Sequence, residues 1–221
     1  MKLGLITIGQ SPRTDITPDI IPIFGPDIEL LQAGALDGLT KEEIAAFTPG
    51  EDDYVLISKL KDGSSVVFAE RYILPRLQNC ITSLENQGAQ VIMFLCTGTF
   101  PDFESRVPVF YPCNILNGSV PALAPRGKIA VITPKEEQIE QCYGKWKELC
   151  KEVTVFAASP YGEPEELDAA AEKVRPLDVD AVLLDCMGFT KEMKVRFREK
   201  SGKLTILSRT LAARNVMELL D

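Results

Sequence analysis

Histidine is absent from this chain of 221 residues. Mechanisms that use a Ser–His or Cys–His pair are therefore excluded, and so are metal sites with imidazole ligands. Long apolar runs are missing as well, because none approaches the roughly 20 residues of a membrane-spanning helix. The segment Met1 to Leu5 runs directly into a strand pattern without the signature of a cleaved leader. We therefore expect a cytoplasmic protein with no membrane partner.

Basic residues are too few and too scattered to bind nucleic acid. The chain has 24 Lys and Arg against 32 Asp and Glu, a formal net charge of −8 and an isoelectric point near 4.8. Binding to a phosphate backbone depends on clustered cations that release counterions. We therefore expect no nucleic-acid partner. The hydrophobic share of 45 % is enough for a complete core in one large domain or two small ones.

The six cysteines form no Cys-x-x-Cys pair and show no zinc-finger spacing. In a reducing compartment they are expected to be free thiols, with no bound metal. Cys113 follows a proline in a loop and has no assigned role. Three others lie in helical patterns and are interpreted as packing or surface thiols: Cys80, Cys142 and Cys150.

Two cysteines in different halves of the chain share one local setting. Cys96 ends the apolar run 91–95, and Cys186 ends the run 181–185. Each is followed two positions later by glycine, which predicts a tight turn that leaves a buried strand and opens a helix. Such a turn places the thiol at the carboxyl edge of a sheet, where open α/β sheets bind ligands. If the protein carries out a reaction, these thiols are the first candidates.

Strand and helix patterns alternate along both halves of the chain. Asp62-Gly63 predicts a β-hairpin, and Thr17, Thr40 and Thr133 mark expected helix starts. The expected strands span residues 3–8, 28–31, 54–59, 65–69, 91–95, 109–110, 128–132, 153–157, 181–185 and 204–207. The expected helices span residues 17–25, 40–47, 70–87, 114–123, 134–150 and 164–174, and two more end at 200 and 220.

This order predicts an α/β fold with two pseudosymmetric lobes, each with a mostly parallel sheet. Both halves run strand, helix, strand, helix, cysteine strand, short strand, helix. We place the first lobe at residues 1–123 and the second at 124–209, with no flexible linker between them. Cys96 and Cys186 then face a common cleft between the lobes, which is the predicted site.

Three segments resemble one protein family. LITIGQSPR at residues 5–13, LDCMGF at 184–189 and LSR at 207–209 resemble the AroM family, over essentially the whole length of the chain. More distantly, the chain is similar to the aspartate/glutamate/hydantoin racemase superfamily. The resemblance implies two lobes, a pair of cysteines across the cleft and a cofactor-independent racemase or epimerase ancestry. It also implies that the C-terminal helix, 210–221, returns to pack on the first lobe.

The turns around the two cysteines differ from those of the amino-acid racemases. That branch usually carries Cys-Asn-Thr in the first lobe and Gly-Cys-Thr in the second, where this chain has Cys96-Thr97-Gly98 and Asp185-Cys186-Met187. The Cys186-Met187-Gly188 turn resembles the hydantoin-racemase and arylmalonate-decarboxylase branch, whose substrates need not be amino acids. The resemblance thus implies a small carboxylate or another small anion as the ligand, and no cofactor.

Two opposed thiols are sufficient to invert a carbon acid, because one removes a proton as the thiolate and the other delivers one. Helix starts lower the pKa of a thiol, so we expect thiolate near neutral pH. Asp185 would raise the pKa of Cys186 unless strand alternation separates the two side chains, which we expect. Backbone N–H groups would hold the enediolate and the substrate carboxylate, and these belong to Thr97, Gly98, Thr99, Met187 and Gly188.

The segment from Gln10 to Arg13 leaves the first strand at the same sheet edge. It is either a polar loop that caps the next helix, or a binding loop in which Ser11 bonds to substrate and Arg13 clamps a carboxylate bidentately. A surface ion pair is a third option for Arg13. Gln10 is counted among the candidates with these two residues.

Further polar residues follow strands of the second half. Thr133 is the counterpart of the first-lobe loop and is interpreted mainly as an N-cap. Ser208 and Arg209 end the last strand and are candidates to reach the cleft, whereas Thr210 is interpreted as a helix cap. Trp146, the only tryptophan, is expected to belong to the core.

Three functions fit these residues. The leading one is a racemase-like or epimerase-like enzyme that acts on a small carboxylate by proton transfer between two thiols. The second is a one-thiol lyase such as a decarboxylase, in which Cys186 protonates an enediolate and Cys96 only packs. The third is a non-catalytic protein that binds a small anion in the cleft. The oligomeric state is open, with a homodimer as one option.

Overall fold

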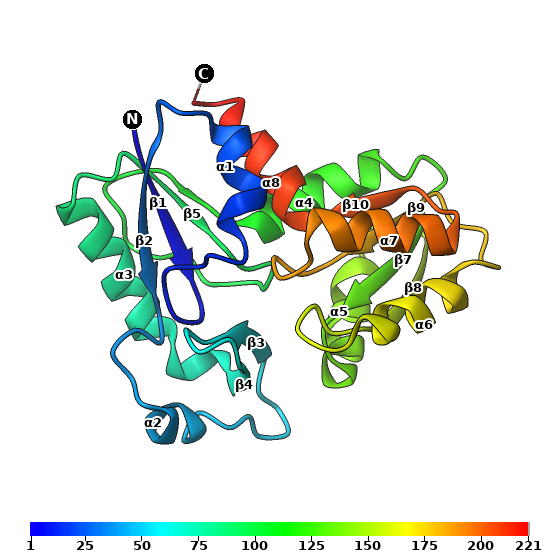
Figure 1. Ribbon diagram of the computed structural model, residues 1–221, viewed down its shortest axis with the longest axis horizontal. Helices are drawn as coiled ribbons and strands as arrows, with labels where there is room; N and C mark the ends of the chain where they lie inside the picture. The colour runs from blue at the N-terminus through cyan, green and yellow to red at the C-terminus, as the bar shows by residue number, and fades with distance from the viewer. Residues whose placement is uncertain (221) are drawn as a thin grey trace.

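Two lobes make up the computed structural model, which describes residues 1–220, and each is built around one four-stranded parallel sheet (Figure 1). The strand orders are β2-β1-β5-β6 in the first lobe and, read from the matching edge, β8-β7-β9-β10 in the second. The two orders correspond strand for strand, so the predicted α/β fold with two pseudosymmetric lobes is confirmed. The strands of these sheets are β1 (Lys2–Thr7), β2 (Glu29–Gly34), β5 (Val91–Phe94), β6 (Val109–Phe110), β7 (Lys128–Thr133), β8 (Glu152–Ala157), β9 (Ala181–Leu184) and β10 (Thr205–Leu207).

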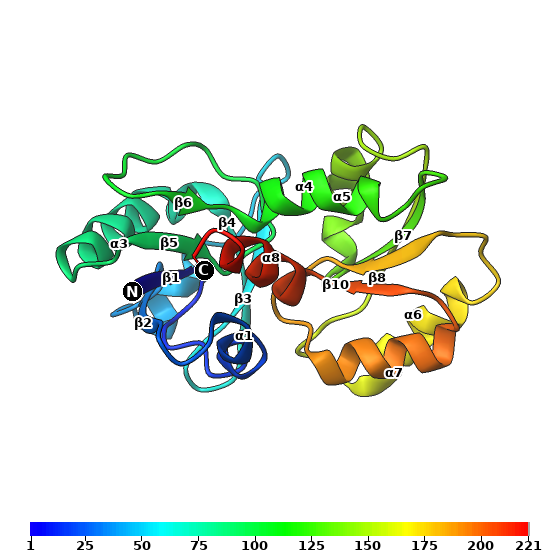
Figure 2. The same cartoon turned by 90° about the horizontal axis from the view of Figure 1, so that it is seen from above.

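Helices cover both faces of each sheet, as Figure 2 shows. The α-helices of the described residues are α1 (Thr17–Phe24), α2 (Lys41–Ala45), α3 (Leu74–Asn86), α4 (Pro112–Ala122), α5 (Ile139–Trp146), α6 (Pro164–Val174), α7 (Lys191–Ser201) and α8 (Ser208–Met217), of which α2 lies beside the hairpin and not on a sheet face. Successive strand residues point to opposite faces, so β1 sends Leu5 to a core cluster with α1 and α8 and Ile6 to a cluster with α3. No helix within residues 1–220 has both the length and the apolar character to cross a bilayer.

β5 and β9 lie inside their sheets because their sequences are apolar throughout. Every residue of both strands is buried, as expected for strands covered on both faces. β5 pairs with β1 up to Ile6, and β9 pairs with β7 up to Ile132. Cys96 and Cys186 each lie two residues beyond these strands, so they leave the two sheets at equivalent points.

Each lobe packs one of its helices on the other lobe. Leu116 of α4 shares a core cluster with Ile129 of β7, although α4 follows the first sheet in the chain. Val216 of α8 shares a core cluster with Leu5 of β1, although α8 follows the second sheet. The lobes are therefore joined by exchanged helices, and the division at residues 123 and 124 stays a prediction.

A hairpin interrupts the repeat in the first lobe only. Its strands, β3 (Val55–Lys59) and β4 (Ser65–Ala69), pair antiparallel around the predicted turn at Asp62-Gly63. Leu56 and Phe68 anchor the hairpin in the core of the first lobe. The preceding helix, α2, begins with the predicted capping box. The hairpin brings β3 to the carboxyl edge of the sheet, where the site lies (Figure 1).

Three helix starts differ from the sequence predictions. Thr17 is the first residue of α1 and not its N-cap. Thr133 caps no helix, because the chain leaves β7 in an extended conformation and passes through the 3-10 turn Glu136–Gln138 before α5 begins. Thr210 lies inside α8, which follows β10 without a loop. In each case the strand or helix next to the threonine extends further than its pattern indicated.

Candidate active site

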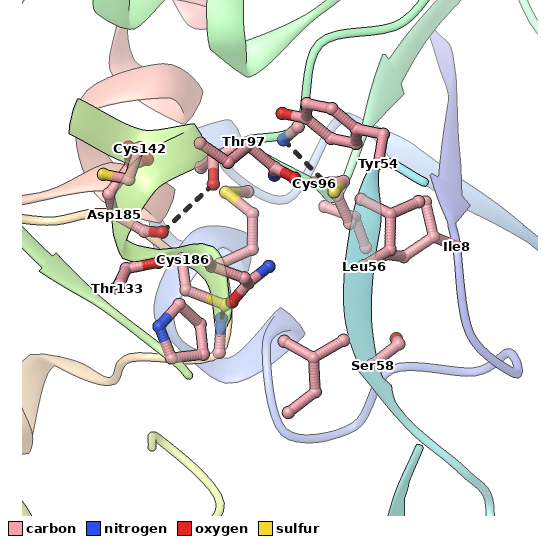
Figure 3. Close-up of a pocket in the computed structure, with 18 of the residues that line it drawn as sticks. Ile8, Tyr54, Leu56, Ser58, Cys96, Thr97, Thr133, Cys142, Asp185 and Cys186 are labelled. Atoms are coloured by element: carbon pink, nitrogen blue, oxygen red, sulfur yellow. Dashed lines mark hydrogen bonds between the residues drawn. The ribbon is translucent and has the colours of Figure 1, made fainter. Parts of the chain in front are cut away.

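A pocket lies at the carboxyl ends of both sheets, and Cys96 and Cys186 both line it (Figure 3). The loop after β1, the hairpin strand β3 and helix α5 complete its wall. The sequence-predicted candidates in this wall are Arg13, Cys96, Thr97, Gly98, Thr133, Cys186, Met187 and Gly188. The structure therefore joins candidates from both lobes in one site.

The two sulfurs are held in the same way. The N–H of Gly98 donates to Sγ of Cys96 over 3.3 Å, and the N–H of Gly188 donates to Sγ of Cys186 over 3.3 Å. In each turn, a backbone N–H group therefore holds the sulfur of the cysteine two residues before it. Because a hydrogen bond to sulfur favours the thiolate, both turns offer equivalent backbone support to a negative charge.

Burial outweighs this support, so the predicted lowering of both thiol pKa values is wrong. Loss of water raises the pKa of Cys96 to about 12 and also raises the pKa of Cys186. Neither turn opens a helix directly, because α4 begins only at Pro112 and α7 only at Lys191. The expected contribution from helix-start N–H groups falls off within about one turn and is not available here.

Asp185 turns its carboxylate toward α5. Oδ2 accepts a hydrogen bond from Nε1 of Trp146 over 2.8 Å and lies 3.5 Å from Nζ of Lys145. Lys145 also donates to the carbonyl of Thr97 over 3.3 Å, and Trp146 is fully buried in the core, as predicted. The negative charge of Asp185 still adds to the effect of burial on the pKa of Cys186. The alternation of side chains along the strand therefore separates the Asp185 carboxylate from the Cys186 thiol less than expected.

Arg13 is buried, with 3 % exposure, and all five of its N–H groups have protein acceptors. Nε and Nη2 donate to the two carboxylate oxygens of Asp15, each over 2.8 Å. Nη1 donates to the hydroxyls of Thr7 and Ser58, and Nη2 also donates to the hydroxyl of Tyr161 over 3.1 Å. Asp15 thus occupies the bidentate position expected for a substrate carboxylate, and the ion pair is not on the surface.

Two tyrosines that were not predicted stand beside the two thiols. Tyr54 lies next to Cys96, and Tyr161, in the loop after β8, lies next to Cys186. Burial raises the pKa of both phenols, which therefore stay protonated at neutral pH. The hydroxyl of Tyr54 accepts from the N–H of Thr99 over 3.2 Å, and neither phenolic hydrogen has an acceptor within residues 1–220. Both are available to a ligand.

The pocket residues that were not predicted differ in how easily the sequence could have identified them. Tyr161 follows the carboxyl end of a strand, and a search for polar residues at every strand end would have found it. Lys145 and Gln138 reach the pocket from α5 and the turn before it, where nothing in the helical pattern distinguishes them from surface residues. Gln138 donates to the carbonyl of Val55 over 3.0 Å, which ties the hairpin to the second lobe.

Gln10, Ser11 and Thr99 do not belong to the pocket wall. The amide of Gln10 donates to two carbonyls of the loop after β2. Ser11 donates its hydroxyl to Asp37 over 2.5 Å. The hydroxyl of Thr99 lies 3.4 Å from the sulfur of Cys113. Gln10 and Ser11 therefore hold the two loops at the end of β1 and β2 together, which is close to the polar-loop interpretation.

Ser208 and Arg209 lie behind the pocket wall. The hydroxyl of Ser208 donates to the carbonyl of Leu184 over 2.6 Å, so it ties α8 to the end of β9. Arg209 is fully buried, and its Nε donates to the carbonyl of Met187 over 2.8 Å. Both residues support the Cys186 turn from the side opposite the pocket.

A family model described as AroM protein matches residues 3–220. No curated protein matches the sequence of this chain.

Several solved structures share the fold. The maleate isomerase Iso from Pseudomonas putida S16 has a TM-score of 0.66 at 15 % identity, covering 100 % of this chain and 92 % of that one. The allantoin racemase from Klebsiella pneumoniae has a TM-score of 0.64 at 13 % identity, covering 99 % and 87 %. The glutamate racemase from Aquifex pyrophilus has a TM-score of 0.60 at 16 % identity, covering 100 % and 84 %. The chain therefore has the fold of the aspartate/glutamate/hydantoin racemase superfamily.

Proposed function

The chain belongs to the AroM family, and from that premise we propose that it is a cofactor-independent, racemase-like or epimerase-like enzyme. Its substrate is a small carboxylate with an acidic C–H, and Cys96 and Cys186 are its acid and base. The observation that carries the proposal is the pairing of two thiols, one from each lobe, in a single pocket. The matching N–H donors on the two sulfurs support it.

The reaction needs a thiolate on one face of a carbon and a thiol on the other. The thiolate removes the C–H proton and becomes a thiol, and the electron pair left on carbon delocalises into the carboxylate as an enediolate. The opposite thiol then delivers its proton to the other face and becomes the thiolate. Atoms and charge balance without a further reactant, and each turnover exchanges the two roles.

Hydrogen-bond donors for the enediolate come from both lobes. The N–H groups of Thr97 and Met187 donate to no acceptor within residues 1–220, and each directly follows one of the cysteines. The phenols of Tyr54 and Tyr161 add two hydroxyl donors. Donors that are already in place favour a transition state in which charge develops on oxygen. We propose that these groups bind the substrate carboxylate and strengthen their bonds as the enediolate forms.

A one-thiol lyase is the second candidate, and the pKa of Cys96 favours it. A thiol with a pKa of about 12 keeps its proton at neutral pH. Such a group suits the delivery of one proton to an enediolate left by loss of carbon dioxide. Burial raises the pKa of Cys186 as well, so either thiol meets this requirement, and the turn pattern favours Cys186.

Deuterium uptake tests the proposal. The protein is incubated in deuterated water with a panel of 2-amino, 2-hydroxy and malonate-type acids, and the acidic carbon is observed by NMR. We expect uptake with the natural chain and with the control Cys150→Ser, whose thiol packs in the core outside the pocket wall. We expect none with the double variant Cys96→Ser/Cys186→Ser, because serine is too weak an acid to form the base.

Two results would count against a racemase-like enzyme. Loss of carbon dioxide from a malonate-type acid, with a single thiol sufficient, would support the lyase. Stabilisation by these acids in a thermal-shift assay, without deuterium uptake or decarboxylation, would leave a protein that only binds small anions.

A further inference from the structure

Arg209 is a fully buried cation with an incomplete set of partners. Its Nε donates to the carbonyl of Met187 over 2.8 Å. Its Nη1 donates to the backbone carbonyl of Asp15 over 2.9 Å and to Oδ2 of Asp19 over 3.0 Å. Its Nη2 has no acceptor within residues 1–220. A buried guanidinium with two unpaired N–H groups is costly, so its position calls for a physical reason.

The partners of Arg209 place it across the junction of the lobes. Arg209 begins in the second half of the chain, on α8, and reaches Asp15 and Asp19 at the start of the first. Arg13 makes the opposite crossing, from the loop after β1 to Tyr161 in the second half. The two guanidiniums therefore approach the Cys186 turn from opposite lobes.

Both guanidiniums lower the pKa of Cys186, against the larger effect of burial. Arg13 is neutralised by its bidentate pair with Asp15, whereas Arg209 shares only one N–H-bearing nitrogen with Asp19. Among the groups that lower the pKa of Cys96 is the ammonium of Lys145. The ionisable and charged groups around Cys186 are Arg13, Asp15, Cys96, Tyr161, Asp185 and Arg209.

We propose that Arg209 is a positioning residue that favours ionisation of Cys186 over that of Cys96. Its bond to the Met187 carbonyl fixes the turn that holds the Cys186 sulfur. Its positive charge, which Asp19 compensates only in part, favours the thiolate. The inference rests on the proposed function for its meaning in catalysis, because Cys186 then removes the proton in the first turnover and Cys96 delivers one. Ionisation of Cys186 itself is measurable without any substrate.

The test is the rate of alkylation of each thiol by iodoacetamide as a function of pH, read by peptide mass. Only the thiolate reacts, so the midpoint of the rate profile reports the apparent pKa. We expect Cys186, which is partly exposed, to react at lower pH than Cys96. Replacement of Arg209 by methionine removes the charge but keeps an unbranched chain, and should slow Cys186 about tenfold at pH 7. The pH profile of the Cys96 alkylation rate should shift much less in this variant.

A variant of opposite sign separates charge from packing. Asp19→Asn removes the carboxylate that pairs with Arg209 and leaves its guanidinium less compensated. Cys186 should then react severalfold faster at pH 7, while Arg209→Lys should retain most of the natural rate because it keeps the charge. A role in folding alone would lower stability in Asp19→Asn and Arg209→Met alike, and would not drive the two profiles in opposite directions.

Two outcomes would overturn the inference. One is a Cys186 profile that stays in place in both Arg209→Met and Asp19→Asn. The other is a shift of the same sign in both variants. Failure of the proposed function looks different, because the expected alkylation profiles would then be found without any deuterium uptake. Deuterium uptake that needs both thiols, combined with unmoved profiles, would remove the role of Arg209 and leave the proposed function intact.

Discussion

The Cys96 side and the Cys186 side of the pocket share a backbone and differ in charge. On both sides the N–H two residues after the cysteine donates to its sulfur over 3.3 Å. Lys145, which also pairs with Asp185, lowers the pKa of Cys96. Two guanidiniums, from Arg13 and Arg209, act on the second sulfur. A repeated fold can therefore supply two equivalent turns, while side chains that cross between the lobes give the two thiols different charged surroundings.

Removal of each thiol in turn is the strongest way to break this comparison. In both Cys96→Ser and Cys186→Ser we expect inversion of a substrate to fall at least about 10³-fold, mainly in kcat. Deuterium uptake should separate the two variants. Cys96→Ser keeps Cys186 as the base and should still exchange the proton of one enantiomer, whereas Cys186→Ser should lose exchange as well. Chiral chromatography combined with mass measurement of the recovered acid gives both values.

Equal exchange in the two serine variants would show that the thiols are interchangeable at rest. Exchange that survives only in Cys186→Ser would reverse the assignment of base and acid. Cys80→Ser serves as the control, since this thiol lies on α3 outside the pocket wall and its removal should leave both activities unchanged.

The two turn glycines provide a matched pair of smaller changes. A Cβ at Gly188 would lie 2.6 Å from the hydroxyl of Tyr161 and 2.8 Å from a ring carbon of Pro160, so that loop must move. A Cβ at Gly98 would meet a methyl group of Leu56 at 3.1 Å, which a side-chain rotation relieves. We expect Gly188→Ala to reduce kcat about 100-fold and Gly98→Ala to reduce it about threefold.

Thermal unfolding of both alanine variants is the accompanying control. Similar melting temperatures with unequal kcat values would assign the effect of Gly188→Ala to the position of Tyr161. A larger decrease in kcat for Gly98→Ala than for Gly188→Ala would show that the Cys96 turn is the more tightly constrained of the two.

The two phenols allow a finer comparison. Tyr161 accepts a hydrogen bond from a charged guanidinium and Tyr54 from a backbone N–H, so the Tyr161 hydroxyl should be the stronger donor. Loss of one such bond costs about 1.4 kcal/mol, or about tenfold in rate. We therefore expect Tyr161→Phe to lower kcat about tenfold and Tyr54→Phe about threefold. A loss confined to KM in both variants would mean that the phenols bind substrate and transition state equally.

The sequence predicted the architecture well because the fold depends on local patterns. The apolar runs that end at Cys96 and Cys186 indicated buried parallel strands, and Asp62-Gly63 indicated the hairpin. The same patterns placed both thiols at the edge where the sheets end. Periodicity and turn residues are short-range signals, and a strand order that repeats along the chain makes them sufficient.

The details of the site depend on contacts between distant segments and were predicted less well. Arg13 was a candidate, but its bond to Tyr161 joins residues on different lobes. The pKa of Cys96 was expected to fall and instead rises, because burial by the hairpin and by the second lobe cannot be read from the turn itself. Arg209 was expected to reach the cleft, and its bond to the carbonyl of Met187 places it behind the wall.

The pH dependence of stability gives the smallest effect, and the prediction concerns the thiol of Cys96. The pKa of Cys96 is raised by burial to about 12 in the folded chain, while an unfolded thiol titrates near 8.5. A group whose folded pKa is raised stabilises the protein below its unfolded pKa, and this stabilisation is lost as pH rises toward the folded value. Between pH 8 and pH 9 the loss from this one thiol is about 0.7 kcal/mol. Urea unfolding at both pH values should therefore show a smaller decrease in stability for Cys96→Ser than for the natural chain. Identical decreases would mean that the Cys96 thiol is ionised, or exposed to water, in the folded protein.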